Sequence, residues 1–183
     1  MNFDITSEFT AIDVHKADSS GTTVFTVHGD GLDPSAGRGS YICQFSSLYN
    51  FNIQHVDASS PDSTTQVQCK TPHWDSAAAT TRVDLLHEDV HGKRTTFFGD
   101  DSNRLFDFEA SYYDVNVHRG DAAGTTEFAV TGYGLDVGVG RGDYLCQWKM
   151  LTGDLHEQSV DAETPDTSTS VPCGARWVLG VGN

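Results

Sequence analysis

Residues 25–45 read FTVHGDGLDPSAGRGSYICQF, and residues 128–148 read FAVTGYGLDVGVGRGDYLCQW, 103 positions later. The match extends upstream and downstream, in the pairs DVHKADSSGTTVF (13–25) with NVHRGDAAGTTEF (116–128) and VDASSPDSTTQVQC (56–69) with VDAETPDTSTSVPC (160–173). A repeat period of this length predicts two copies of one domain and argues against a short-repeat solenoid.

Short runs in which apolar and polar residues alternate fill each copy. Residues 41–45 (YICQF) alternate in this way, and residues 144–148 (YLCQW) do so in the second copy. A period of two is typical of strands whose side chains point in turn to the two faces of a sheet. Gly, Asp, Ser and Pro separate the runs, as in the turns of an antiparallel sandwich. The predicted fold class is all-β, with two tandem immunoglobulin-like β-sandwiches.

The expected domains are residues 1–109 and residues 110–183. In the repeat register Asn183 falls at the position of Thr80, ahead of the strands expected around residues 83–85 and 105–108. The second sandwich should therefore lack its last strands, which would leave an apolar groove and an open sheet edge. Three explanations are open: a shortened chain, a naturally reduced sheet, or a strand donated by another chain.

The four cysteines fall two in each copy, at matching positions. Four cysteines allow three pairings. The duplication favours pairing within each copy, Cys43 with Cys69 and Cys146 with Cys173. The alternative, a zinc ion held by all four thiolates, typically needs closely spaced pairs such as Cys-x-x-Cys, which this sequence lacks. Disulfides indicate an oxidising compartment, outside the cell or within the secretory pathway.

The first copy carries a specific series of motifs: GTTVFTVHGDGL (21–32), YICQF (41–45), TTQVQCKTPHW (64–74), TTRVDLLHED (80–89) and LFDFEA (105–110). This series resembles the IPT/TIG domain, the immunoglobulin-like module of plexins, other cell-surface receptors and some transcription factors. The resemblance implies a β-sandwich with mainly non-catalytic roles in spacing, adhesion and partner binding. The second copy departs from it, with CGARW (173–177) where the first copy has CKTPHW (69–74).

Charge narrows the range of partners. The formal net charge is −15, from 11 Lys and Arg against 26 Asp and Glu. Nucleic-acid binding relies on basic side chains that replace counterions along the phosphates, so that partner is not expected. No stretch approaches the roughly 18 apolar residues of a membrane helix, so direct membrane insertion is not expected. The start, MNFDITSEFT (1–10), lacks the features of a secretory signal, which indicates an added methionine or a piece of a longer chain.

Residues 87–91 read HEDVH and match the His-Glu-x-x-His signature of zinc proteases. That chemistry needs a helix, on which His87 and His91 face one zinc ion and Glu88 activates a water. The repeat register instead predicts a hairpin with its turn near Gly92. On a strand the two histidines would lie about 13 Å apart and could not bind one metal. The zinc-hydrolase hypothesis therefore stands as an alternative.

Two further sets of residues are candidate binding sites. Arg141, Gly142 and Asp143 form an integrin-type tripeptide in a Gly-rich loop, whose glycine is also explained by turn geometry. Asp100, Asp101 and Asn103 cluster in GDDSN as a candidate calcium site. Carboxylates in such turns also serve as acceptors for local backbone N–H groups, which is the simpler interpretation. Apart from calcium at these positions, no cofactor is predicted.

The sequence favours a non-catalytic structural or adhesion module of an extracellular or cell-surface protein, and it makes the chain a candidate subunit of an assembly or filament. The expected partners are proteins or further copies of the chain. A zinc-dependent hydrolase and a carbohydrate-binding accessory module are the alternatives, and they differ in what they would bind. Metal analysis of the purified protein discriminates the first alternative, and a glycan array discriminates the second.

Overall fold

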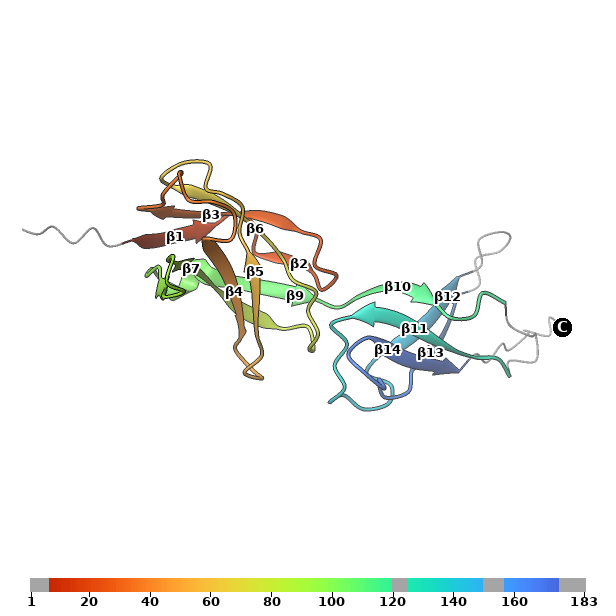
Figure 1. The fold of residues 1–183 in the computed structure, drawn as a ribbon. Helices are drawn as coiled ribbons and strands as arrows, with labels where there is room; N and C mark the ends of the chain where they lie inside the picture. Colours follow the sequence, from red (N-terminus) through yellow and green to blue (C-terminus); the bar gives the residue numbers. More distant parts are fainter. Residues whose placement is uncertain (1–6, 120–124, 150–156, 175–183) are drawn as a thin grey trace, which may run out of the picture. The chain divides into compact units, whose positions relative to one another are not determined.

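The structure is a computed structural model, and it describes residues 7–119, 125–149 and 157–174 (Figure 1). The contacts between Cα atoms divide the chain into two compact units. Unit 1 comprises residues 1–74 and 78–109, and unit 2 comprises residues 75–77 and 110–183. Strands make up almost all of the regular structure in both units. Within the described ranges, no helix has the length and apolar character needed to cross a membrane.

The first sheet of unit 1 contains β1 (Glu8–Ile12), β3 (Val24–Asp30) and β6 (Gln66–Lys70), in the order β1-β3-β6. Both pairings are antiparallel. A bulge interrupts the β1–β3 register between Phe9 and Ala11. Gly29 lies opposite this bulge, where an added Cβ would collide with the carbonyl oxygen of Glu8. The position therefore requires glycine, which explains why a glycine stands inside an otherwise regular strand.

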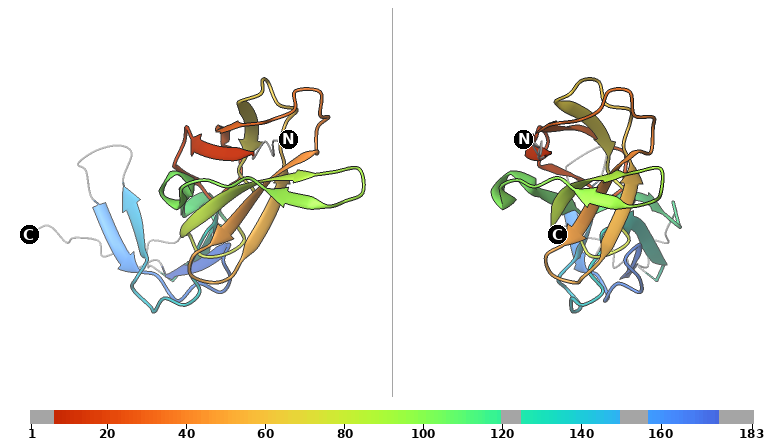
Figure 2. Two further views of the ribbon diagram at one scale, coloured as in Figure 1. Left: turned by 90° about the vertical axis from the view of Figure 1, so that its left-hand side faces the viewer. Right: turned by 60° about the vertical axis from the view of Figure 1, so that its left-hand side comes forward.

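The second sheet of unit 1 has the order β2-β9-β7-β4-β5, with β8 paired to β7 (Figure 1). Its strands are β2 (Lys16–Asp18), β4 (Tyr41–Ser47), β5 (Ile53–Asp57), β7 (Thr80–Glu88), β8 (Arg94–Thr96) and β9 (Leu105–Glu109). A short 3-10 helix, η1 (Asp101–Arg104), precedes β9. The β7–β8 hairpin extends beyond the rest of the sheet (Figure 2).

The core of unit 1 lies between the two sheets, and the alternation in the sequence decides which residues enter it. The rings of Phe25, Phe45 and Phe106 contact one another at centroid distances of 5.5 to 6.0 Å. Trp74 stacks on Phe108 at 4.6 Å. All five side chains are buried. Burial of a side chain of this size stabilises the fold by roughly 1.5–3 kcal/mol, so the aromatic cluster is the main apolar contribution to unit 1.

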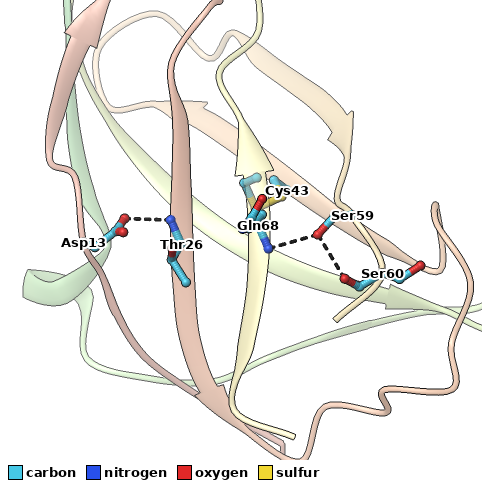
Figure 3. Close-up of a disulfide and its surroundings, with 7 residues drawn as sticks. Asp13, Thr26, Cys43, Ser59, Ser60 and Gln68 are labelled. Atoms are coloured by element: carbon cyan, nitrogen blue, oxygen red, sulfur yellow. Dashed lines mark hydrogen bonds between the residues drawn. A yellow bond between two sulfur atoms is a disulfide. The ribbon is translucent and has the colours of Figure 1, made fainter. Parts of the chain in front are cut away.

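A disulfide joins the two sheets of unit 1, from Cys43 on β4 to Cys69 on β6, with 6.1 Å between the Cα atoms (Figure 3). Beside it, Ser59 Oγ accepts a hydrogen bond from the backbone N–H of Gln68 and donates one to the carbonyl of Ser60. These contacts fix the segment after β5 against β6. The bridge therefore fastens the sandwich at its centre, where both half-cystines are buried.

Unit 2 has the same arrangement with fewer strands. Its first sheet, in the order β10-β11-β14, contains β10 (Ser111–Val115), β11 (Glu127–Tyr133) and β14 (Ser170–Gly174). Its second sheet contains β12 (Leu145–Lys149) and β13 (Glu157–Asp161). The disulfide between Cys146 on β12 and Cys173 on β14 joins the two sheets. The bulge in β1 also recurs, between Tyr112 and Asp114 on β10.

The five strands of unit 2 match β1, β3, β4, β5 and β6 of unit 1 in repeat position, and β2, β7, β8 and β9 have no counterpart in the described residues. The predicted all-β class and the immunoglobulin-like β-sandwich are confirmed. The prediction that residues 87–91 belong to a hairpin is also confirmed, since β7 and β8 pair antiparallel around them.

Candidate functional site

The zinc-protease signature of residues 87–91 falls on the β7–β8 hairpin. His87 lies near the end of β7, and His91 lies in the turn, next to Gly92 with a φ of 76°. A helix would bring the two imidazoles together on one face, whereas a strand that runs into a turn does not. His87 and His91 therefore do not form the pair of zinc ligands that the signature describes on a helix.

Each of the three residues from His87 to Asp89 has a structural partner. The ring of His87 packs on the ring of Tyr41, with 5.0 Å between centroids. Glu88 accepts a hydrogen bond from Arg94 Nε at 2.6 Å across the hairpin. Asp89 Oδ1 accepts hydrogen bonds from two turn N–H groups, those of His91 and Lys93, each at 2.9 Å. The N–H of Lys93, followed by that of His91, holds the pKa of the Asp89 carboxyl below its usual value.

The candidate calcium residues also lie in local turn structure. Asp100 is the N-cap of η1, and its Oδ1 accepts hydrogen bonds from the backbone N–H and the hydroxyl of Ser102, each at 2.8 Å. These two bonds lower the pKa of the Asp100 carboxyl. The carboxylate therefore has a capping function that needs no metal. Calcium at Asp100, Asp101 and Asn103 stays a prediction.

Metal-ligating side chains do not gather elsewhere in the described ranges. No group of three or more His, Cys, Asp or Glu side chains within those ranges is placed to hold a metal ion. The acidic side chains of the Gly-rich loops act as backbone acceptors instead. Asp33 Oδ1 accepts from the N–H and hydroxyl of Ser35, and in unit 2 Asp136 Oδ1 accepts from the N–H of Gly138.

The tripeptide Arg141-Gly142-Asp143 lies in the loop before β12 and is partly engaged with its own unit. Arg141 forms an exposed ion pair with Glu163 at 3.3 Å. Asp143 Oδ2 accepts a hydrogen bond from the N–H of Gly140 at 2.7 Å. Gly142 has a φ of 89°, a conformation that favours glycine. The loop geometry thus accounts for the glycine, and adhesion through this tripeptide stays a prediction.

The feature that distinguishes the two units is an open apolar face in unit 2. In unit 1 the inward face of β3 and β6 lies against the second sheet, to which β7 and β9 contribute the buried Val83, Leu85, Phe106 and Phe108. In unit 2 the corresponding face borders a groove of about 770 Å³. Its apolar lining comes from Phe128, Val130, Leu135, Tyr144, Trp148 and Val171.

The side chains of this face keep the packing of unit 1 with less cover. Phe128 and Trp148 meet edge to face at 5.2 Å, as the repeat-equivalent Phe25 and Phe45 do at 5.9 Å. Phe25 and Phe45 are fully buried, whereas Phe128 and Trp148 are only partly buried. The face is therefore built like a sandwich core, and the described residues of unit 2 cover it less completely.

Two positions show which strands provide the cover in unit 1. Ile42 on β4 is opposite Leu86 of β7 and is 5 % exposed, and its counterpart Leu145 on β12 is 64 % exposed. Phe9 on β1 lies under the guanidinium of Arg104, which is 5.2 Å from the ring centroid, and is 1 % exposed. Its counterpart Tyr112 on β10 is 79 % exposed. The strands and the η1 turn that cover unit 1 are those with no described counterpart in unit 2.

Comparisons with known proteins give fold-level similarity only. No family model matches the chain, and no curated protein matches it. Among solved structures, the full extracellular region of plexin A4 aligns with 97% of this chain and 22% of its own, at 9% identity and a TM-score of 0.35. The chicken CNTN1 FN1-FN3 domains align with 94% of this chain and 54% of their own, at 11% identity and a TM-score of 0.30.

The sequence interpretation anticipated an incomplete second sandwich but named no residues for its groove. The repeat could have identified them, because the apolar residues that pack against β7 and β9 in unit 1, such as Phe25 and Phe45, have the counterparts Phe128 and Trp148 in unit 2. In the Gly-rich loops and the His-Glu-x-x-His signature, Asp33, Asp136 and Asp89 accept hydrogen bonds within their own turns.

Proposed function

We propose that this chain is a non-catalytic structural or adhesion module of an extracellular or cell-surface protein, and that it acts by binding other polypeptides. The single observation that carries this proposal is the pair of disulfides at repeat-equivalent positions, each of which joins the two sheets of its own unit. Such bridges persist in oxidising compartments and are rare in the cytosol. No free cysteine is present to suggest redox chemistry.

The net charge and the local partners of the polar motif residues support the same function. A net charge of −15 opposes binding to nucleic acid and to anionic surfaces. Among the polar residues that sequence motifs single out in unit 1, Glu88 forms an ion pair across the hairpin, Asp89 accepts from turn amides, and Asp100 caps η1. The resemblance to IPT/TIG modules supports spacing and partner binding as the role.

For a direct test, the chain is secreted from eukaryotic cells and its disulfides are identified by peptide mapping without reduction. The proposal expects Cys43 joined to Cys69 and Cys146 joined to Cys173, with no free thiol. Free thiols in the secreted protein, or bridges between the units, would contradict it.

Metal analysis of the same preparation tests the hydrolase alternative. The proposal expects no stoichiometric zinc, either in the unaltered chain or in His87→Ala. Stoichiometric zinc that disappears in His87→Ala and persists in the matched control His55→Ala would favour the hydrolase and overturn the proposal.

A further inference from the structure

Unit 1 shows what kind of segment completes the open face of unit 2. In unit 1, β7 runs antiparallel to β4, with Val83 opposite Phe45 and Leu85 opposite Cys43. The repeat equivalents of Phe45 and Cys43 are Trp148 and Cys146 on β12. The place beside β12 therefore accepts an extended strand with two apolar residues separated by one position. In the described part of the chain, the second sheet of unit 2 ends at β12 on this side.

The sequence of this chain contains a segment with that pattern outside the described residues. Residues 2–6 read NFDIT and lie 103 positions before residues 105–109, which read LFDFE and form β9. Phe3 and Ile5 therefore occupy the repeat positions of Phe106 and Phe108. The same apolar-Asp-apolar triplet occurs in β7 as residues 83–85. Residues 2–6 thus have the composition of the strands that cover the core of unit 1.

The order of elements around this segment also matches. In unit 1, β9 ends at Glu109, one residue, Ala110, follows, and β10 begins the next unit at Ser111. Residues 2–6 are followed by one residue, Ser7, and then by β1, which begins at Glu8. A segment of the β9 type therefore leads directly into the first strand of a sandwich in both places. In unit 1, β9 pairs with β7 and not with β4, so a segment added beside β12 takes the place of β7, one strand nearer than its own repeat position.

We propose that residues 2–6 of a second copy of this chain bind in the open groove of unit 2, antiparallel to β12, with Phe3 opposite Trp148 and Ile5 opposite Cys146. This inference rests on the proposed function and deepens it, because it names the partner as another copy and the contact as an added β-strand. The segment matches the five residues of β12 in length. Phe3 is larger than Val83, and the groove has room for it because β9 also has no described counterpart.

The contact is heterologous, since it joins residues 2–6 of one chain to unit 2 of another. A heterologous contact of this kind propagates into a filament unless the rotation closes a ring. The buried contact is apolar, whereas each chain has a net charge of −15. Mutual repulsion of the chains is screened by salt, so association should strengthen as salt rises. Association through surface ion pairs would weaken instead.

Sedimentation velocity on the full 183-residue chain tests the proposal, over a hundredfold range of concentration and at low and high salt. We expect the average mass to rise with concentration, and to rise further at high salt. The double variant Phe3→Asp, Ile5→Asp should remain a monomer under all of these conditions. The matched control Asp4→Asn, which changes a residue between the two apolar positions, should associate like the unaltered chain.

A peptide of residues 1–7 provides the complementary measurement on the double variant, whose own segment is disabled. We expect the peptide to slow hydrogen exchange in β12, and a peptide with both aspartate substitutions to leave exchange unchanged. A chain that stays monomeric throughout, or one that associates equally well in the double variant, would overturn the proposal. Either result would leave the disulfide pairing unaltered, so the proposed function would stand or fall separately.

Discussion

Arg104 donates a hydrogen bond from Nη1 to Oδ1 of Asp84 across 2.7 Å, and the two side chains are only 7 % and 3 % exposed. The same guanidinium donates from Nη2 to the carbonyl of Gly99 at 2.7 Å and lies over the ring of Phe9. Arg104 therefore connects η1 to β7 and to β1, on the face of the sheet opposite the aromatic core. The ion pair fixes the strand that unit 2 lacks in its described part.

The first prediction concerns this buried pair. Arg104→Met should lower the free energy of unfolding by about 3 kcal/mol, because it leaves the buried carboxylate of Asp84 with only Arg82, a partly exposed partner. Urea unfolding followed by circular dichroism measures the change. Arg94→Met is the matched control. It removes an exposed pair with Glu88 and should cost less than about 1 kcal/mol. Equal effects of the two variants would contradict the assignment.

The second prediction compares the two disulfides. Replacing both cysteines of either unit by alanine should cost about 3 kcal/mol, mainly because the unfolded chain gains freedom. Unit 2 has the smaller described core, centred on Leu135, Ala162 and Val171, so it should lose its structure first. Hydrogen exchange read separately on β11 and β3 distinguishes the units. If Cys146→Ala, Cys173→Ala leaves β11 as protected as β3, the predicted weakness of unit 2 is wrong.

The third prediction is a pH dependence at the β7–β8 turn. The pKa of Asp89 is lowered in the folded state, so its contribution to stability is present above the unfolded pKa of about 3.9 and is lost as pH falls through the folded value. The melting temperature should therefore fall on acidification below about pH 4. Asp89→Asn should show a smaller fall. A fall of the same size in that variant would show that the turn carboxylate contributes nothing.

The sequence pattern was sufficient for the sandwich and for the hairpin around residues 87–91, because period-two alternation and the duplication can both be read without knowledge of distant contacts. It was not sufficient for Asp84. Between Val83 and Leu85 on β7, an aspartate is expected to point outward to water. The structure buries it because η1, about 20 positions later in the chain, folds over that outer face and brings Arg104 to it. Long-range pairing of this kind leaves no periodic signal.

The signature at residues 87–91 also depends on the local structure. The pattern His-Glu-x-x-His describes side chains on a helix, and the same letters on a hairpin place Glu88 beside Arg94 and Asp89 against the turn amides. The groove of unit 2 was anticipated as an absence of strands. The residues that line it could not be predicted in the same way, because the burial of Phe128 or Trp148 depends on strands elsewhere in the chain.

The most direct test of this account is a comparison of hydrogen exchange in β4 and β12, measured on the dilute chain so that copies do not associate. The two strands occupy the same place in two sandwiches, and β7 pairs with β4, whereas no described strand pairs with β12 on that side. The backbone amides of residues 145–149 should exchange faster than those of residues 42–46, while those of the central strand β11 remain protected. Equal protection of β4 and β12 in the dilute monomer would contradict an open face in unit 2.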